Sequence, residues 1–400
     1  MDLISDHPFW PLKSGLIRSY PRLQTDLDCE VLVLGAGITG ALCAYHMVQA
    51  GMDVVVLDKR DVASGSTSAS TAMLQYEIDT PLTDLIMRMG KADAERAYRA
   101  CLESIGKIAS LCDEVGDSCG FTWKSSVYLA SGEKDVPGLQ AEYAARRAAG
   151  IELDFLSQAD VEARFSFSRP AALLSKVAAE VDVYQLTHRL LQRSQEAGCR
   201  IFDRTAMASY AVRPDGVTMT TGTGAKARAK WIVFATGYEV VEVLKRDIVQ
   251  LNSSFAFVSE PLESFPGWWE KCLLWETARP YLYMRTTEDG RAIIGGEDAR
   301  YRDPLRRDAA LADKVAKLGK RFREMFPAID LQPAYAWAGT FGETKDGLAY
   351  IGSVPEAQRC IFTLGFGGNG ITYSVIAAEI VRDMIHGVDH QYARLFRFDR

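Results

Sequence analysis

The sequence predicts an α/β protein organised around a parallel sheet. The apolar run Val31–Leu34 is typical of a buried strand, and a Gly-x-Gly-x-x-Gly motif at 35–40 follows it directly. Residues 41–50 then have a helical pattern, and Val54–Leu57 forms a second apolar strand that closes in Asp58. A strand, a glycine-rich turn, a helix, a second strand and an acid in this order indicate a dinucleotide-binding unit.

Each glycine of the motif has its own physical role. Gly35 permits the tight turn after the strand, Gly37 lets a pyrophosphate approach the backbone, and Gly40 lets the helix pack closely on the strand. The phosphates are expected on the free N–H groups of the helix N-terminus, where the helix dipole is positive. Ile38 and Thr39 lie between these glycines and belong to the same predicted site.

Asp58 lies 58 − 35 = 23 positions after Gly35. This is close to the spacing of roughly 20 residues at which a carboxylate accepts the ribose hydroxyls of an adenosine. An acid at this position disfavours the 2′-phosphate of NADP, although Lys59 and Arg60 beside it leave that possibility open.

Composition excludes several classes of function. The 400 residues are 48% hydrophobic and 24% charged, which is typical of a globular chain long enough for two domains. The formal charge of −6 argues against nucleic acid or an anionic membrane as partner. No signal pattern and no membrane-span-length run is visible, so a cytoplasmic location is expected. The eight cysteines and five histidines are scattered, so we expect free thiols and no metal site.

The rest of the chain alternates between helical and strand-like segments. Residues 1–28 lack periodicity and are expected to form an arm on the surface of the first domain. Ser64–Thr71 is a run of small hydroxyl residues that could line a phosphate or a flat ring, or could be a flexible loop. Helices are expected over 81–115, 136–150, 184–197 and 311–325, and strands over 121–130, 199–202, 207–213, 217–221, 279–284 and 291–296.

Two later segments also place small residues after a buried strand. Residues 231–234 lead into Ala235-Thr236-Gly237, and the strand at 360–364 leads into a glycine-rich junction at 365–370 and a helix at 371–385. One helix N-terminus is enough to bind a pyrophosphate, so the second helix N-terminus indicates that another electron-rich group is bound. A reduced flavin fits, since its negative charge lies at the pyrimidine end of the ring.

Several motifs, taken together and in order, resemble the D-amino-acid oxidase family of FAD-dependent oxidoreductases, which includes glycine oxidase, sarcosine oxidase and gamma-glutamylputrescine oxidase. They are the glycine triplet, the hydroxyl loop ending at Thr71-Ala-Met-Leu74, the central Ala-Thr-Gly, Trp337-Ala-Gly followed by Thr344-Lys-Asp-Gly and Tyr-Ile-Gly, and Gly-Phe-Gly-Gly-Asn-Gly-Ile at 365–371. The resemblance covers nearly the full length of the chain.

The resemblance implies a Rossmann-like FAD-binding domain interleaved with an α+β substrate domain of antiparallel sheet. The FAD-binding domain is expected over 1–78, 151–245 and 336–400, and the substrate domain over 79–150 and 246–335. The positions matching the family's cofactor contacts are Gly35, Gly37, Ile38, Thr39, Gly40, Asp58, Lys59, Ser66, Thr67, Ser70, Thr71, Met73, Met207, Ala235, Thr236, Gly237, Gly342, Gly367, Gly368, Asn369, Gly370, Ile371 and Thr372.

The resemblance also implies a reaction. Family members transfer a hydride from a C–H next to an amine nitrogen to flavin N5, which gives an imine, and the reduced flavin usually passes its electrons to oxygen to form peroxide. No cysteine or histidine falls on a position of covalent flavin attachment, so non-covalent FAD is expected. The expected partners are an amine or amino-acid substrate and oxygen or another electron acceptor.

The sequence departs from the family at one informative position. Glycine-oxidase-type members carry an arginine two positions after Trp-Ala-Gly that binds the substrate carboxylate, and here that position is Phe341. A substrate other than a simple α-amino acid is therefore favoured. Arg285 could replace the missing arginine, or could form an ion pair on a hairpin surface.

Three further residues, and Glu77 beside one of them, are candidate substrate contacts. Tyr76, together with Glu77, follows the flavin loop and could reach the substrate, or could lie at a solvated strand end. Tyr283 shares the Tyr-x-Arg pattern of the gamma-glutamylputrescine oxidase branch, and Trp337 could pack beside the flavin ring or in the core.

Two alternative functions remain open at this point. One is a dehydrogenase of the same fold that passes electrons to an acceptor other than oxygen. The other is an FAD-binding component, such as a tRNA-modification protein, in which the fold is reused without amine oxidation. NAD as the sole cofactor would leave the C-terminal glycine loop unexplained.

Overall fold

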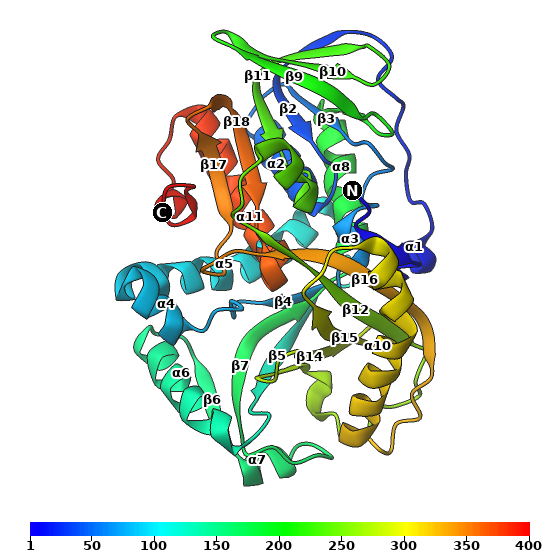
Figure 1. Cartoon of the computed structure of the whole chain (residues 1–400), viewed down its shortest axis with the longest axis vertical. Helices are drawn as coiled ribbons and strands as arrows, with labels where there is room; N and C mark the ends of the chain where they lie inside the picture. The colour runs from blue at the N-terminus through cyan, green and yellow to red at the C-terminus, as the bar shows by residue number, and fades with distance from the viewer.

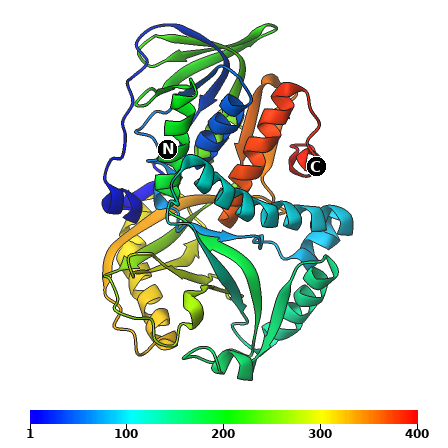
Figure 2. The same cartoon turned by 180° about the vertical axis from the view of Figure 1, so that it is seen from behind.

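The computed structural model describes residues 1–400 and arranges them around two β-sheets (Figure 1). One sheet has eight strands and the other has ten. The eight-stranded sheet lies in the upper half of the molecule and the ten-stranded sheet in the lower half, and the view from behind shows the same division (Figure 2). Each sheet is assembled from segments that are far apart in the sequence.

The eight-stranded sheet is parallel at its centre. Its order is β17 (Tyr350–Val354), β18 (Ala357–Leu364), β11 (Lys226–Phe234), β2 (Leu27–Leu34), β3 (Val54–Leu57) and β8 (Arg200–Phe202), with β10 (Gly216–Thr221) and β9 (Met207–Arg213) attached to β11 as a hairpin. Strands β18 to β8 run parallel, whereas β17 and the hairpin are antiparallel to their neighbours. This sheet confirms the fold class predicted from the first strand, turn and helix.

Both faces of the central strands are buried, which explains their continuous apolar runs. Val31 and Val33 face a core that includes helices α2 (Ile38–Gln49), α5 (Lys91–Val115), α8 (Val183–Glu196) and α11 (Gly370–His386). Leu32 and Leu34 face a second core shared with β10 and α9 (Val240–Leu244). Helix α2 is the crossover between parallel strands β2 and β3, as the glycine motif predicts.

The ten-stranded sheet is antiparallel except where β13 pairs with β5. Its order is β1 (Ile4–Asp6), β16 (Pro333–Glu343), β12 (Gln250–Ser259), β15 (Ala292–Ala299), β14 (Leu282–Thr286), β13 (Leu273–Glu276), β5 (Thr122–Leu129), β7 (Ala171–Glu180) and β4 (Met73–Gln75), with β6 (Leu153–Ser157) also paired to β7. The remaining helices are α1 (Phe9–Ser14), α3 (Ser66–Ala69), α4 (Leu82–Met89), α6 (Val136–Ala148), α7 (Gln158–Glu162) and α10 (Pro304–Met325).

Sheet membership differs from the predicted segment boundaries in several places, and both β1 and β4, expected in the cofactor domain, belong to the ten-stranded sheet. The segment predicted as 151–245 of the cofactor domain is divided, because β6 and β7 belong to the ten-stranded sheet and only β8 onward joins the eight-stranded one. Strand β16 also belongs to the ten-stranded sheet, although its second half was expected in the cofactor domain. Helix α5, expected in the substrate domain, shares the core of α2 and α11.

The N-terminal arm agrees with the surface arm predicted for it over residues 15–26, which have no helix or strand and are mostly exposed, but not over residues 1–14. Strand β1 pairs with β16 at the edge of the ten-stranded sheet. Phe9 and Trp10 on α1 are buried, and the Trp10 indole Nε1 donates a hydrogen bond of 2.7 Å to the carbonyl of Ser70. The arm therefore supports the loop that follows the dinucleotide-binding unit.

Two helix boundaries also differ from expectation. The pattern over 81–115 is two helices, because Gly90 at φ 85° breaks it between α4 and α5. Helix α10 begins at Pro304 rather than at residue 311, since Asp303 caps it by accepting a hydrogen bond from the Arg306 N–H. All eight cysteines are free thiols, and none of the helices is long and apolar enough to cross a membrane.

Candidate cofactor and substrate cavity

A cavity of about 430 Å³ lies between the two sheets and is lined by residues of both. One end of this cavity, which we call the turn end, is lined by Gly35, Gly37, Asp58, Thr67 and Thr236. Gly35, Gly37, Asp58 and Thr236 come after strands β2, β3 and β11, and Thr67 lies in the hydroxyl loop. The other end, which we call the aromatic end, is lined by large side chains of the ten-stranded sheet and of the segments that flank it. This group consists of Trp275, Tyr281, Tyr283, Trp337 and Phe341.

The first glycine turn is packed so closely that side chains cannot be accommodated. A Cβ on Gly35 would lie 2.3 Å from the carbonyl oxygen of Ala235, and Gly35 has φ 101°. A Cβ on Gly40 would lie 1.8 Å from the carbonyl oxygen of Gly35. These contacts are the close approaches that the motif requires. Gly40 acts through this packing and does not itself line the cavity.

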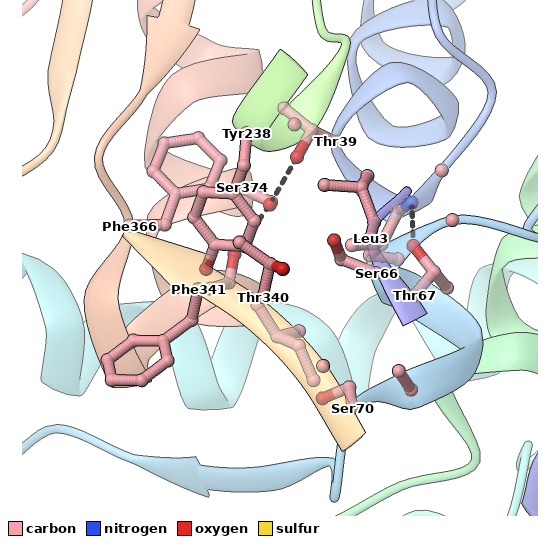
Figure 3. Close-up of a pocket in the computed structure, with 18 of the residues that line it drawn as sticks. Leu3, Thr39, Ser66, Thr67, Ser70, Tyr238, Thr340, Phe341, Phe366 and Ser374 are labelled. Atoms are coloured by element: carbon pink, nitrogen blue, oxygen red, sulfur yellow. Dashed lines mark hydrogen bonds between the residues drawn. The ribbon is translucent and has the colours of Figure 1, made fainter. Parts of the chain in front are cut away.

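The hydroxyl loop is ordered against the start of α2 (Figure 3). The Thr67 hydroxyl accepts a hydrogen bond of 2.9 Å from the N–H of Ile38. A Cβ on Gly37 would lie 2.9 Å from the same oxygen, so only glycine leaves this space open. Thr39 is linked to Ser374 of α11 through a 2.8 Å hydrogen bond between their hydroxyls, which brings the N-terminal turns of α2 and α11 together.

Charged residues at the turn end are arranged in two groups. Asp58 accepts hydrogen bonds from the backbone N–H of Ala36 at 2.7 Å and of Arg60 at 2.8 Å, and burial raises the pKa of its carboxyl. Lys59 and Arg60 both pair with Glu239, at 2.6 and 2.9 Å. Burial opposes ionisation of Glu239, but its hydrogen bonds from these two cations outweigh burial and lower its pKa.

The C-terminal glycine loop is tied to the segment that follows β4. The N–H of Gly368 donates a 2.8 Å hydrogen bond to Asp79, and the amide of Asn369 donates to the carbonyl of Glu77 at 2.9 Å and of Gln75 at 3.3 Å. Residues 75–79 therefore hold the loop in front of α11.

The turn end fits a nucleotide-containing cofactor such as FAD. The hydroxyls of Ser66 and Thr236 line the cavity, yet neither oxygen has a hydrogen-bond partner within the protein. Buried hydroxyls without partners are uncommon, and a bound ligand with phosphate and ribose groups would satisfy them. All but two of the predicted cofactor residues line the cavity. The two exceptions are Gly40 and Gly342, whose Cβ would lie 2.5 Å from Val249.

Three of the five predicted substrate-site residues line the aromatic end. Trp337 is 1% exposed, and its indole Nε1 donates a 2.8 Å hydrogen bond to the carbonyl of Ala69, which fixes the ring beside the hydroxyl loop. Tyr283 lies against Gly295, where a Cβ would come within 2.4 Å of the tyrosine ring. Phe341 extends from β16 beside Thr340 and near Tyr238 and Phe366 (Figure 3).

The prediction that Tyr76 contacts the substrate is wrong. Tyr76 is fully buried in the core and packs against Tyr98, and it does not line the cavity. The reason is strand alternation, because side chains two residues apart share a face. Met73, Gln75, Glu77 and Asp79 line the cavity, whereas Leu74, Tyr76 and Ile78 lie in the core.

The prediction that Arg285 holds a substrate carboxylate is also wrong, and so is its alternative of a surface ion pair. Arg285 is 2% exposed and does not line the cavity. Its guanidinium donates hydrogen bonds to the carbonyls of Ala72 at 2.8 Å, Val181 at 3.1 Å and Thr286 at 2.8 Å. Arg285 therefore supports the end of the hydroxyl loop from behind.

Several residues of the cavity were not predicted from the sequence. Trp275, Tyr281 and Tyr238 are among its largest side chains, and Glu239 pairs with both of its cations. For Tyr238 and Glu239 a signal existed, since they directly follow the Ala-Thr-Gly segment. For Trp275 no local signal existed, because its position depends on the pairing of β13 with β5 and β14.

Comparisons with known proteins agree on one family and one fold. A model of the FAD-dependent oxidoreductase family matches residues 30–384. A putative Rieske 2Fe-2S iron-sulfur protein of Bacillus subtilis is 22% identical over 396 residues, which cover 97% of this chain and 74% of that protein. Glycine oxidase of Bacillus licheniformis is 23% identical over 375 residues, which cover 93% of this chain and 97% of that enzyme.

A solved structure supports the same fold. The crystal structure of glycine oxidase from Geobacillus kaustophilus is similar with a TM-score of 0.78 at 19% sequence identity. The similarity covers 91% of this chain and 96% of that one. The likeness shows that the interleaved arrangement of the two sheets is shared.

Proposed function

Because the chain belongs to the D-amino-acid oxidase family of FAD-dependent oxidoreductases, we propose that it oxidises the C–N bond of an amine or amino acid and passes the electrons to oxygen. The observation that carries this proposal is the single cavity that joins the motif-lined turn end to a chamber walled by aromatic side chains. A cofactor held at the turn end and a small substrate held at the aromatic end would share one enclosed space.

The protein's own contribution is to bind and to position. The turn end would hold the phosphates and ribose of FAD with backbone N–H groups, Ser66, Thr67 and Thr236. FAD, when bound, supplies the acceptor for the hydride and hands its two electrons on. We expect FAD to be bound without a covalent link, because neither cysteine nor histidine lines the cavity. Acid precipitation should then release the flavin into the supernatant.

The reaction removes two electrons from the substrate. The C–H bond next to nitrogen breaks with both electrons leaving as hydride, the nitrogen lone pair forms the C=N bond, and water hydrolyses the resulting imine. Oxygen gains two electrons and two protons and becomes hydrogen peroxide. The reacting nitrogen must arrive neutral for its lone pair to be available, so no strong protein base is required.

The aromatic walls would orient the substrate and exclude water. Trp337 is fixed by its hydrogen bond to Ala69, and Tyr283 is held against Gly295. A rigid wall restricts the substrate to few orientations, which is the main way in which such a site accelerates the reaction. Phe341 gives this wall no cation where a carboxylate would need one.

Oxygen uptake and peroxide formation test the proposal. FAD-loaded protein mixed with a panel of amines and α-amino acids should consume oxygen and form peroxide in equal amounts with at least one class. Absence of oxygen uptake, together with an unchanged flavin spectrum under anaerobic conditions, would contradict it.

A second candidate is a dehydrogenase that uses an acceptor other than oxygen. The observation that favours it is the similarity to a protein described as a putative Rieske 2Fe-2S iron-sulfur protein. In this case an amine would bleach the flavin anaerobically. The rate at which air restores the flavin colour would be lower than the rate with an iron–sulfur protein or an artificial one-electron acceptor. Rapid reoxidation in air would exclude this candidate.

A further inference from the structure

The cavity contains more negative than positive groups. Five carboxylates and two cations line it, and both cations, Lys59 and Arg60, are already paired with Glu239. Among the lining residues carried by or next to the ten-stranded sheet, the charged ones are Glu77 and Asp79, and no lysine or arginine is among them. A substrate carboxylate at the aromatic end would therefore meet negative charge among the lining residues, and an arginine beside them, Arg279, lies outside the lining with its guanidinium 4.8 Å from the Tyr281 ring centroid.

Glu77 is the buried carboxylate of this group. Its side chain is 2% exposed, and its Oε2 has no hydrogen-bond partner. Its nearest cation is Arg146, with 3.7 Å between Nη1 and Oε1, which is too long for a hydrogen bond. Burial raises the pKa of Glu77, and the positive charge of Arg146 opposes this shift without cancelling it.

Arg146 pairs more closely with Glu142 than with Glu77, although its Nη1, which faces Glu77, has no hydrogen-bond partner. Its Nε donates a 2.7 Å hydrogen bond to Glu142. Glu142 also accepts hydrogen bonds from the backbone N–H groups of Leu82 at 2.8 Å and Thr83 at 3.0 Å, so it remains ionised. The three side chains Glu77, Glu142 and Arg146 together carry two negative charges and one positive charge when ionised, and the excess charge belongs to Glu77.

Aromatic side chains line the same part of the cavity, because the Ser126 hydroxyl accepts hydrogen bonds from the Trp275 indole at 3.2 Å and from the amide of Gln75, two residues before Glu77, at 2.9 Å. Trp275 is stacked on Tyr128 with 3.7 Å between ring centroids, and its indole Nε1 is bonded to Ser126. Tyr281 and Tyr283 also line the cavity, with 5.5 Å between their ring centroids. Rings of this kind attract a cation through their negatively charged faces, and they attract it more strongly when water is excluded.

We propose that the aromatic end binds a substrate amine through a second cationic group, which pairs with Glu77 among Trp275, Tyr281 and Tyr283 while the reacting nitrogen is neutral. This assignment rests on the proposed function and narrows its substrate class to amines that carry an additional positive charge, such as straight-chain diamines. Glu77 is then a specificity-determining residue, because the incoming cation supplies the partner that its Oε2 lacks.

The test uses two probes of the same shape and opposite charge. The tert-butylammonium ion has no hydrogen on the carbon next to nitrogen, so it cannot be oxidised, and pivalate replaces its ammonium by a carboxylate. Calorimetric titration of the FAD-loaded protein should show binding of tert-butylammonium at least tenfold tighter than binding of pivalate. Equal binding of the two probes, or tighter binding of pivalate, would overturn the proposal.

Two variants assign the effect to Glu77. Glu77→Gln keeps the shape of the side chain and removes its charge, and it should weaken tert-butylammonium binding at least tenfold without changing the binding of pivalate. Glu343→Gln is the matched control, because Glu343 is a nearby carboxylate that does not line the cavity. Loss of binding in both variants, or in neither, would contradict the role of Glu77. The probe comparison in the unmodified protein decides the proposal even if Glu77→Gln does not fold.

Substrate measurements separate this inference from the proposed function. If diamines bleach the flavin anaerobically with a kcat/KM at least tenfold above that of monoamines and α-amino acids of equal length, both stand. If α-amino acids are the better substrates, the inference fails while the proposed function stands. If tert-butylammonium binds as expected but no amine or amino acid bleaches the flavin, the proposed function fails and the cation site remains.

Discussion

The turn end and the aromatic end of the cavity are built in different ways. The turn end consists largely of backbone from short segments that each follow one strand, and its charged groups are paired within the protein. The aromatic end consists of side chains on or next to β13, β14 and β16, which are brought together by sheet pairing. Glu77, which follows β4 and lines the same cavity, has an oxygen without a hydrogen-bond partner. The first end thus fits one cofactor, whereas the second can vary its side chains to select a substrate.

The largest expected effect comes from the glycine turn. Gly40→Ala would place a Cβ 1.8 Å from the carbonyl oxygen of Gly35, so the turn must move. We expect a loss of more than about 3 kcal/mol in the free energy of unfolding, together with loss of bound FAD. Denaturation curves and the ratio of flavin to protein absorbance measure both effects.

The matched control lies in an open helix position. Gly106 on α5 has no atom within 4 Å of an added Cβ. Gly106→Ala should retain FAD and raise the free energy of unfolding by up to about 1 kcal/mol, because alanine favours the helix. Equal behaviour of the two variants would show that the close contacts in the turn are not needed.

A substitution of Arg285 tests whether this residue supports the hydroxyl loop or binds the substrate. Arg285→Met would leave three buried carbonyls without their donor, so we expect a loss of about 2–3 kcal/mol in stability and weaker FAD binding. The preference between amines and α-amino acids should not change. A selective rise in KM for α-amino acids at unchanged stability would instead restore Arg285 as a carboxylate-binding residue.

A smaller effect is expected at the hydroxyl loop. Thr67→Val removes the acceptor of the Ile38 N–H and should cost about 1–2 kcal/mol in the free energy of unfolding. Because Thr67 also lines the cavity, the dissociation constant of FAD should rise. Thr67→Ser keeps the hydroxyl and should retain most of the FAD affinity, and failure of serine to do so would point to packing rather than to the hydrogen bond.

The smallest effect concerns the pH dependence at the aromatic end. Burial raises the pKa of Glu77 in the folded protein, so stability associated with Glu77 is present below its unfolded value of 4.5 and is lost as pH rises through the folded value. The facing groups Arg146, Glu142, Tyr76 and Tyr98 remain in place in Glu77→Gln. The melting temperature of Glu77→Gln, relative to that of the unmodified protein, should therefore increase as pH rises above 4.5. A constant difference would mean that Glu77 does not titrate in this range.

The turn end is easier to predict from the sequence than the aromatic end, because the two ends are built in different ways. Gly35, Gly37 and Asp58 lie within or directly after one strand–helix–strand unit, so their arrangement depends on local backbone geometry that a motif encodes. The position of Arg285 depends on the pairing of β14 with β13 and β15, which places it behind the hydroxyl loop. No local pattern contains that information.

Tyr76 and Glu77 show an intermediate case. Both follow the hydroxyl loop and both were candidates from the sequence, but only Glu77 lines the cavity. Alternation along an extended segment would have separated them, since Gln75 and Glu77 share one face and Leu74 and Tyr76 share the other. Residues that follow a strand are therefore better predicted by their face than by their distance from the motif.

The visible absorption spectrum of the purified protein, recorded anaerobically before and after addition of a straight-chain diamine, tests the central claim most directly. We expect a flavin band that the diamine bleaches, because the proposed function places FAD at the turn end and the amine at the aromatic end. A protein that shows no flavin band even after incubation with FAD would contradict the account. So would a band that no amine or amino acid bleaches.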